Sequence, residues 1–380
     1  MRVILQNIET YFEPVLRDTD RQIVEDLAKV HALAGVIRGI PIPPSVQRRL
    51  DRLNILRAVQ GTTGIEGTEL SEEEIDLVVE SSPGDAPLGL GREREEQEVR
   101  NAEALMRYVA EYVEYNPTAP ISEALISRFH EILTQDISYP HNEPGHYRNH
   151  AVTVGTYRPP PTGEEVRRLM AEFVRWFNTD LPTHWDPVLR AIVAHFYVVS
   201  IHSFGDGNGR TSRAVESFLL YKAGVNVRGY YSLSNYYYRN RPEYIANLNL
   251  VRQQEGFNLT PFVSFALKGL VQELESVHEE ALGEVRIIAF RDYSREALAD
   301  TGKLGTPAGE RQLRFLIDLS GSSVSFKELR SGGHTLSRLY RNVTSRTLAR
   351  DINYLKQQNL IVVAGDEIRA NLELMTRFTA

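Results

Sequence analysis

Apolar residues recur at helical spacing along most of the chain. The serine at position 122 can cap a helix, and the residues after it repeat at intervals of three and four. That apolar face comprises Leu125, Ile126, Phe129, Ile132 and Leu133. Ser71 and Glu74 form the pattern of a capping box, and the prolines and glycines of 81–91 end that helix before a charged run towards Tyr115. Strand patterns are scarce, so the sequence predicts a mainly α-helical fold.

One segment before the C-terminal region has the pattern of a strand. The stretch 150–163, HAVTVGTYRPPPTG, places the β-branched or extended-favouring residues Val152, Thr153 and Val154 before Gly155. Three prolines follow and cannot continue a ladder of hydrogen bonds. A short β-hairpin is predicted here.

The last eighty residues have a different pattern and a different charge. From Arg311 the chain shows three apolar helical segments, and LIVVAGDEIRANL then reads as two strands around Gly365 and Asp366. Residues 301–380 hold twelve Lys and Arg against seven Asp and Glu, a net charge of +5 within a chain of −7. A separate small domain with a winged-helix-like arrangement is predicted for 305–380.

The third predicted helix of this region has two distinct faces. Leu348, Ile352 and Leu355 share the apolar face, and a polar stripe lies largely opposite. The stripe consists of Arg346, Arg350, Asn353 and Gln357. It suits a helix that reads DNA, but a solvated face or a protein-docking surface stays open as an alternative.

Composition narrows the available chemistry. The chain has 380 residues and no cysteine, which excludes disulfides, thiolate metal sites and a cysteine nucleophile. Catalysis must therefore use histidine, carboxylates, hydroxyls or a bound metal. No apolar run approaches the roughly 18 residues of a membrane span, and the N-terminus lacks the features of a secretory signal. We expect a cytoplasmic protein without a membrane partner.

The most informative stretch is IHSFGDGNGRTSRAV, residues 201–215. It lies between an apolar segment that predicts a buried helix and a second helix that ends near Gly224. Gly207, Asn208 and Gly209 allow backbone N–H groups to converge at the start of the second helix, which makes an anion cradle.

The charged residues of this stretch favour a phosphate ligand. Arg210 and Arg213 lie at the positive end of a helix dipole, which is unfavourable unless an anion offsets them. A polyphosphate would do so. Asp206 offers a hard oxygen ligand for Mg²⁺ beside the phosphates, and His202 can take a hydroxyl proton near neutral pH.

As a set, these residues match the pattern HxFx(D/E)GNGRxxR and resemble the active-site motif of the Fic family. The matching positions are His202, Phe204, Asp206, Gly207, Asn208, Gly209, Arg210 and Arg213. Fic proteins are α-helical enzymes that typically transfer AMP from ATP to a hydroxyl of a target protein and release pyrophosphate. The resemblance implies a similar helical core at 111–295, after an N-terminal helical region at 1–110.

The resemblance implies a role for each position of the motif. His202 would deprotonate a Ser, Thr or Tyr of a protein substrate, and the chain itself stays open as one such substrate. Asp206 would hold Mg²⁺, and the loop Gly207–Gly209, with the side chain of its asparagine, would cradle the phosphates of ATP. Arg210 and Arg213 would neutralise the phosphate tail. Ser203 stands where proline is common in the family.

Three further features resemble parts of Fic proteins. Val152–Gly155 would be the edge of a flap that aligns the target as an added strand. TTGIEG, residues 62–67, resembles the inhibitory (S/T)xxxE(G/N) motif, with Glu66 pairing with Arg213 and Thr62 holding the same helix. Gly64 costs about 1 kcal/mol in a helix interior and predicts a soft brake. Tyr244 is a candidate for the nucleotide pocket.

Several alternatives stay open. The same fold supports removal of AMP from a modified protein, or transfer from another nucleotide donor. A different class is a winged-helix DNA-binding regulator whose Fic-like region senses nucleotides. DNA and a second copy of the chain, as a homodimer, stay open as partners. His195, seven residues before His202, is predicted to be a structural core histidine.

Overall fold

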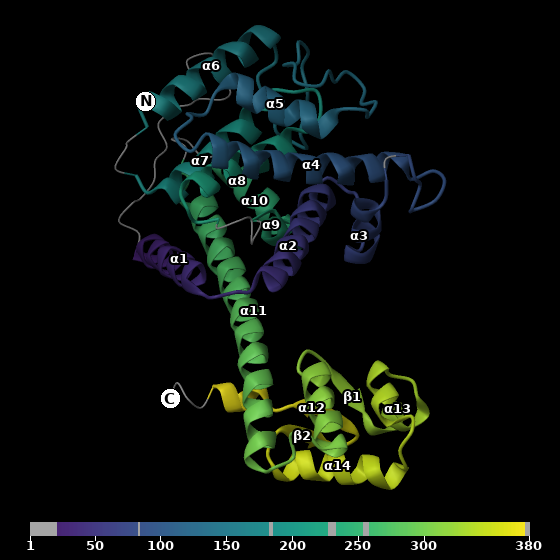
Figure 1. Cartoon of the computed structure of the whole chain (residues 1–380). Coiled ribbons are helices and arrows are strands. Elements are labelled where there is room, and N and C mark those ends of the chain that lie inside the picture. The colour runs from purple at the N-terminus through teal and green to yellow at the C-terminus, as the bar shows by residue number, and fades with distance from the viewer. Residues whose placement is uncertain (1–20, 83, 182–184, 227–232, 254–257, 377–380) are drawn as a thin grey trace. The chain divides into compact units, whose positions relative to one another are not determined.

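The computed structural model describes residues 21–376 except 83, 182–184, 227–232 and 254–257. It divides into two compact units, 1–278 and 279–380, and the division falls within one long helix, α11 (Thr260–Asp300). The first unit is helical, which confirms the predicted fold class (Figure 1). Its other helices are α1 (Arg21–Gly39), α2 (Pro44–Ile65), α3 (Glu72–Glu80), α4 (Glu93–Tyr115), α5 (Glu123–Thr134), α6 (Gly163–Thr179), α7 (Pro187–Ile201), α8 (Asn208–Lys222), α9 (Leu233–Arg239) and α10 (Arg241–Gln253).

The predicted helix starts follow from side-chain capping. The Ser122 hydroxyl accepts a hydrogen bond from the Leu125 N–H and begins α5. Ser71 and Glu74 form the predicted capping box at α3, with both reciprocal bonds present. Helix α3 ends at Glu80 and α4 begins at Glu93, so the Gly- and Pro-rich stretch separates the two helices, as predicted. The predicted boundary between residues 110 and 111 lies inside α4.

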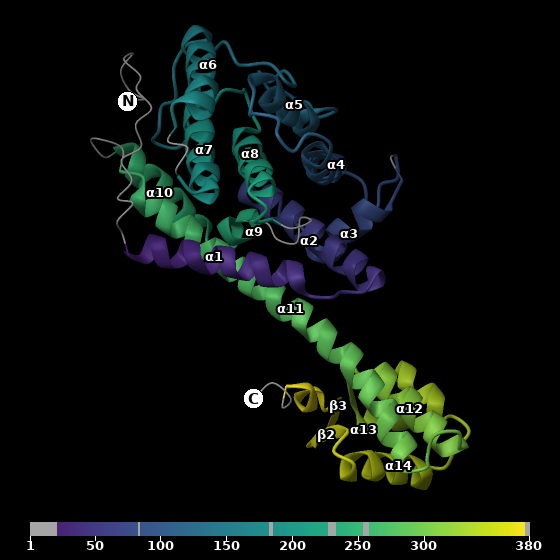
Figure 2. The same cartoon turned by 60° about the vertical axis from the view of Figure 1, so that its left-hand side comes forward.

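The centre of the first unit is the pair α7 and α8. Every residue of α7 from Val188 to Ile201 except Arg190 is buried, because the helix is apolar on all sides. Helix α8 packs on α7, and α4 and α5 also contact α8 (Figure 2). The short loop that joins α7 to α8 therefore begins and ends on two helices fixed in the core.

Helix α2 packs closely against α9. A Cβ at Gly61 would lie 2.6 Å from the Asn235 backbone nitrogen, and one at Gly64 would lie 2.4 Å from the Tyr238 ring. The two glycines thus permit the close approach of the helices. Both glycines therefore have a packing function. The prediction from Gly64 considered only its cost in a helix interior and did not include this function.

The predicted hairpin after Arg148 is reduced to a single bridged pair. Val154 and Tyr157 exchange both backbone hydrogen bonds at 2.9 Å, and Gly155 turns the chain with φ of +57°. Val152 and Thr153 join no strand ladder within the described chain. The strand prediction was therefore wrong in extent, because the prolines from position 159 leave no room for a partner strand.

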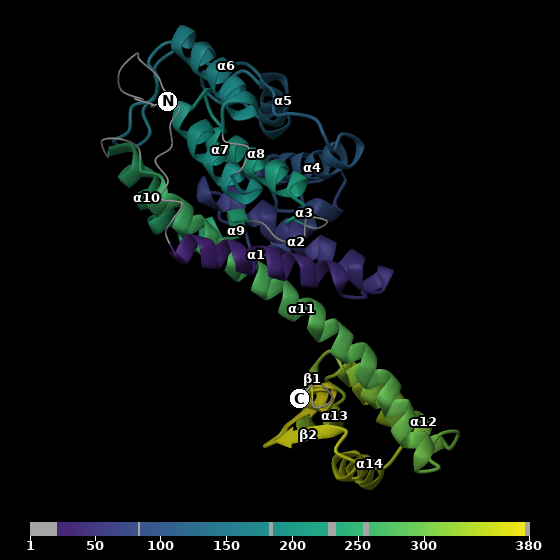
Figure 3. The ribbon, with the colours of Figure 1, turned by 90° about the vertical axis from the view of Figure 1, so that its left-hand side faces the viewer.

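The second unit combines helices with one antiparallel sheet (Figure 3). Its elements after α11 are α12 (Pro307–Leu319), β1 (Ser323–Ser325), α13 (Phe326–Ser331), the 3₁₀ helix η1 (Thr335–Tyr340), α14 (Ser345–Gln357), β2 (Ile361–Ala364), β3 (Glu367–Ala370) and the 3₁₀ helix η2 (Leu372–Met375). The sheet has the order β1-β3-β2, with Val363 opposite Ile368.

The two strands predicted around Gly365 and Asp366 are confirmed as β2 and β3. The sequence analysis missed β1 and α13, which are too short for a periodic pattern. The second of the three helical segments predicted after Arg311, which centres on Leu336 and Leu339, is the 3₁₀ helix η1. In the described part of the chain, no helix has the length and apolar character needed to cross a membrane.

Candidate active site

The loop between α7 and α8 has two residues in the left-handed region of backbone conformation. His202 ends α7 with φ of +53°, and Gly207 precedes α8 with φ of +71°. For histidine this conformation is unfavourable by about 1 kcal/mol or more, so surrounding contacts must hold it. Gly209 lies within α8, and its backbone is helical rather than left-handed.

The ring of His202 is arranged as a proton acceptor. Its Nδ1 lies 3.2 Å from the carbonyl oxygen of Val199, and a carbonyl can only accept. Nδ1 therefore carries the hydrogen, and Nε2 keeps its lone pair. Burial lowers the pKa of His202 to about 4, and the charges of Arg252 and Arg148 act in the same direction. The neutral, basic form of the ring is present at neutral pH.

Arg148 fixes the backbone at His202. Its Nε donates to the His202 carbonyl at 2.7 Å, and its own N–H donates to the Ser203 carbonyl at 2.9 Å. The other guanidinium nitrogens donate to the carbonyls of His150 at 2.5 Å and Pro160 at 2.7 Å. Arg148 is 3% exposed. It joins the loop between α7 and α8 to both ends of the segment that carries the bridged pair.

His130 holds the other end of the loop. Its ring stacks on Phe204 with centroids 3.8 Å apart, and its Nδ1 accepts a hydrogen bond from the Gly145 N–H at 2.9 Å. Nε2 therefore donates to the Asp206 carbonyl at 3.0 Å. Burial lowers the pKa of His130 to about 4, so the ring is neutral. Phe204 is fully buried and anchors the loop in the core.

Asp206 and Arg210 contact each other. Asp206 Oδ1 accepts from the Gly207 N–H at 2.5 Å and from Arg210 Nη2 at 3.2 Å. Arg210 is buried, and the same Nη2 donates to the Tyr139 hydroxyl at 2.9 Å. Glu98 Oε1 lies 3.8 Å from Arg210 Nη1. The carboxylate of Asp206 remains 43% exposed, so it is accessible to a cation.

Asn208 closes the loop with its side chain. Its Oδ1 accepts from the Phe204 N–H at 2.8 Å, and its Nδ2 donates to the Phe204 carbonyl at 2.9 Å. Both polar atoms are thus used inside the loop. These two bonds shape the loop, and the phosphate contact of Asn208 that the sequence analysis expected stays a prediction.

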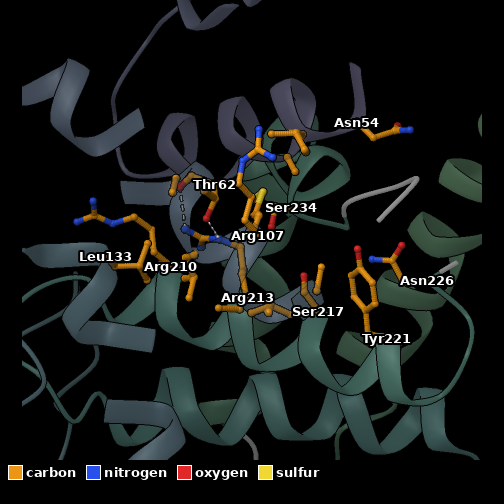
Figure 4. A pocket seen from close by; sticks show the side chains of 18 of the residues that line it. Asn54, Thr62, Arg107, Leu133, Arg210, Arg213, Ser217, Tyr221, Asn226 and Ser234 are labelled. Atoms are coloured by element: carbon orange, nitrogen blue, oxygen red, sulfur yellow. Dashed lines mark hydrogen bonds between the residues drawn. The ribbon is translucent and has the colours of Figure 1, made fainter. Parts of the chain in front are cut away.

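Helix α2 reaches the site through Thr62 and Glu66. Arg213 Nη2 lies 2.7 Å from Glu66 Oε1, and the same guanidinium donates from Nε to the Thr62 hydroxyl at 3.1 Å. Figure 4 shows Thr62 and Arg213 pointing toward one another. Arg213 is 2% exposed. A Cβ on Gly209 would lie 2.3 Å from Glu66 Oε1, so the carboxylate occupies the space that a side chain at 209 would need.

The electrostatics of Glu66 agree with this pairing. Burial would raise the pKa of Glu66, but the charges of Arg213 and Arg210 outweigh it and hold that pKa below its usual value. Its side chain is 37% exposed, while that of Arg213 is buried. The carboxylate is therefore ionised at neutral pH and covers the arginine.

Behind Arg213, helices α2, α4 and α8 enclose a cavity of about 300 Å³ (Figure 4). Thr62 and Arg213 form part of its wall, together with apolar residues such as Leu105 and Val109. The cavity lies along α8, beyond the contact of Arg213 with α2.

Tyr244 does not line an open pocket. It is 3% exposed, its ring stacks on Tyr237 at 4.7 Å, and its hydroxyl lies 2.9 Å from His195 Nε2. His195 is fully buried, with Nδ1 3.1 Å from Glu216 Oε2. His195 is the predicted core histidine, and the burial of Tyr244 does not support its assignment to nucleotide binding.

Sequence reasoning missed Arg148 and His130, as well as Tyr139 and Glu98 around Arg210. A histidine or glutamate on a helix has no pattern that marks its burial against a distant loop. Arg148 lies in the stretch GHYRNH beside the predicted hairpin, and only the fold shows that its guanidinium reaches position 202.

Comparison with known proteins gives a consistent result. Residues 120–220 match the model of the Fic/DOC family. "Protein adenylyltransferase fic-1" of Caenorhabditis briggsae is 29% identical over 268 residues, which cover 67% of this chain and 46% of that protein. The chain thus spans less than half of this curated relative.

Two solved structures share the fold. One is a Fic family protein from Desulfovibrio desulfuricans G20, with a TM-score of 0.55 and 23% identity, covering 94% of this chain and 98% of that chain. The other is residues 134–508 of Fic-1 from C. elegans, with a TM-score of 0.54 and 25% identity, covering 67% of this chain and 71% of that chain.

Proposed function

Since the chain is a member of the Fic family through the domain at residues 120–220, we propose that it is a protein adenylyltransferase. It would transfer AMP from ATP to a Ser, Thr or Tyr hydroxyl of a protein. The observation that carries this proposal is the orientation of His202. A neutral ring with its free lone pair on Nε2 lies in the same short loop as an anion cradle.

The reaction uses one base and one site for the phosphates. His202 Nε2 takes the proton as the hydroxyl oxygen of the target forms a bond to the α-phosphorus of ATP. The bond between that phosphorus and the bridging oxygen to the β-phosphate breaks, and pyrophosphate leaves with its electron pair. Backbone N–H groups at the start of α8 and the cations Arg210 and Arg213 offset the phosphate charge.

Asp206 fits a magnesium ion that accompanies ATP. Mg²⁺ commonly binds through one or two carboxylates plus phosphate oxygens, and the partly exposed carboxylate of Asp206 meets that requirement. When bound, the ion would supply positive charge at the phosphates. Arg210 keeps the carboxylate in place through the 3.2 Å contact with Oδ1.

The pairing of Glu66 with Arg213 supports an autoinhibited state. Arg213 would neutralise the terminal phosphate of ATP, and in this state Glu66 holds its guanidinium while Thr62 ties it to α2. The segment Val152–Gly155, in which Thr153 and Gly155 are exposed, would align the target segment as a flap. Release of Glu66 would free Arg213 for ATP.

The test is transfer of label from ATP carrying ³²P at the α-phosphate, in the presence of Mg²⁺. Purified wild type, Glu66→Gly and the double variant Glu66→Gly with His202→Ala are compared for label that remains on protein after denaturation. We expect the label to rise in Glu66→Gly and to vanish when His202→Ala is added to that variant. Absence of label in Glu66→Gly, with ATP binding retained, would overturn the proposed transfer and favour AMP removal or another donor.

A further inference from the structure

The second unit presents a group of exposed arginines that the proposed transferase reaction does not use. They lie on α13, on and just after η1, and on the outer face of α14. The group consists of Arg330, Arg338, Arg341, Arg346 and Arg350. Among the described residues, none of the five forms a salt bridge with a carboxylate.

Other arginines of the same unit are paired, which makes this group distinct. Arg311 Nη2 lies 2.7 Å from Asp351 Oδ2, and Arg314 lies 3.7 Å from Asp318. Asp351 is 1% exposed and also accepts from Gln312 at 2.8 Å. The Asp351 carboxylate therefore pairs with Arg311 on the buried side of α14 and does not neutralise the arginines on the exposed side.

A groove runs beside these arginines. It has a volume of about 610 Å³, and its lining includes Arg330, His334, Arg338 and Arg341 but no Asp or Glu. Thr344 and Ser345 line the same groove at the N-terminus of α14, a helix of 13 residues. The positive end of the helix dipole thus adds to the charge of the side chains.

The outer face of α14 continues this surface. Leu348, Ile352 and Leu355 face the core of the unit. The four residues of the predicted polar stripe are all exposed, at intervals of four, three and four positions. They are Arg346, Arg350, Asn353 and Gln357. An α-helix with its side chains is about 10–12 Å in diameter, which fits the major groove of duplex DNA, about 12 Å wide. At 1.5 Å per residue α14 is about 20 Å long.

We propose that the second unit binds duplex DNA, with α14 in the major groove and the five arginines on the phosphates. Arg330, Arg338 and Arg341 border the groove at the N-terminus of α14, where a phosphate strand would pass. Asn353 and Gln357 have amide groups that can donate and accept toward base edges. Asp366 lies in the turn between β2 and β3 and Glu367 begins β3, so this acidic end of the hairpin would stay away from the phosphates.

The test is fluorescence anisotropy of the full chain with a labelled 24-base-pair duplex of random sequence, titrated at several salt concentrations between 50 and 200 mM. Each phosphate contact contributes about −0.9 to the slope of log affinity against log salt, so four or five contacts predict a slope near −4. Arg346→Ala with Arg350→Ala should weaken binding about ten-fold or more at low salt and reduce the slope by about two.

The matched control removes the same charge from another part of the unit. Arg295 and Arg314 are 58% and 70% exposed and pair with acids of their own helices, so Arg295→Ala with Arg314→Ala should leave the slope unchanged. Asn353→Ala with Gln357→Ala should keep the slope, because the two amide groups would face base edges rather than phosphates. Thermal unfolding of every variant shows that the unit still folds.

Three results would overturn the proposal: no duplex binding at 50 mM salt, equal loss in both double-arginine variants, or binding to single-stranded RNA of equal length but not to duplex DNA. A surface that captures only an acidic protein would give the first result. Label transfer from ATP is expected to be the same in all these variants, which separates this proposal from the transferase.

Discussion

The Arg213 guanidinium and the Glu66 carboxylate lie 2.7 Å apart, although 147 residues separate them in the sequence. The contact is possible because α2 packs on α8 and α9, and because Gly209 has no side chain. Arg213 is buried and already bound to Thr62, so Glu66 acts on a guanidinium that cannot turn away. If Glu66 inhibits the enzyme as proposed, the strength of this contact sets the degree of inhibition.

Glu66→Gly should raise protein labelling from α-labelled ATP by about ten-fold. A hydrogen bond between charged groups contributes roughly 1.5–3 kcal/mol, and the partial exposure of Glu66 places it at the lower end. Initial rates of labelling at saturating ATP measure the effect. Glu69→Gly removes the same charge three residues later, at an exposed side chain that is not among the described partners of Arg213, and should leave the rate unchanged. Equal rates in wild type and Glu66→Gly would show that the pair does not restrain the enzyme.

Gly61→Ala should loosen α2 rather than strengthen it. The added Cβ would lie 2.6 Å from the Asn235 backbone, so the helices must separate, at a cost of about 1–3 kcal/mol. We expect a lower unfolding temperature together with faster labelling. Helix propensity alone predicts the opposite result, a gain of about 1 kcal/mol and slower labelling.

Gly35→Ala is the control for helix propensity. Gly35 lies within α1, and a Cβ there would have no atom within 4 Å. This variant should gain stability by about 0.5–1 kcal/mol without a change in labelling. If Gly61→Ala behaves like Gly35→Ala, the packing function inferred for Gly61 is wrong.

The sequence predicted local features better than contacts between distant segments. The caps at Ser71 and Ser122 and the strands around Gly365 depend on neighbouring residues, and they are present as predicted. The pairing of Glu66 with Arg213 is also present in the structure. It could be predicted because the motif resemblance specified both residues. Spacing and composition alone did not relate these two positions.

Features that depend on tertiary packing were missed or misread. Gly64 was interpreted from helix propensity, yet its position is explained by the Tyr238 ring, which lies far along the sequence. The hairpin was inferred from β-branched residues, but strand length is decided by a partner strand that the prolines exclude. The use of Asn208 within its own loop and the burial of Tyr244 likewise follow from packing.

Arg148→Lys should lower the kcat of the Glu66→Gly enzyme while the KM for ATP changes little. Arg148 acts on the backbone of His202, and a misplaced base affects the chemical step more than ATP binding. Lysine keeps the charge but cannot reproduce the guanidinium fork to three carbonyls, so we expect a loss of about ten- to hundred-fold. Arg158→Ala, at an exposed arginine beyond the bridged pair, should retain kcat. A rise in KM without a fall in kcat would contradict a positioning role.

The pH dependence of labelling tests the environment of His202. Burial lowers its pKa to about 4, so the neutral base is fully present above about pH 5. The kcat of Glu66→Gly should therefore be flat between pH 6 and 8 and fall only as the pH approaches 4. An ordinary histidine, with a pKa of about 6.5, would place the fall near pH 6.5. A midpoint near 6.5 would show that the ring is solvated and that its burial does not persist in solution.

The same shift affects stability, with a defined sign. Because the folded pKa of His202 lies below the unfolded value, the unfolded chain binds the proton more tightly. The contribution of the neutral ring is complete above about pH 6.5 and is lost as the pH falls toward about 4. His130 has a lowered pKa of about 4 and the same sign. Between pH 7 and pH 4.5, the free energy of unfolding measured with urea should thus decline less in His202→Ala than in wild type. An equal decline in the two proteins would show that other groups cause the pH dependence.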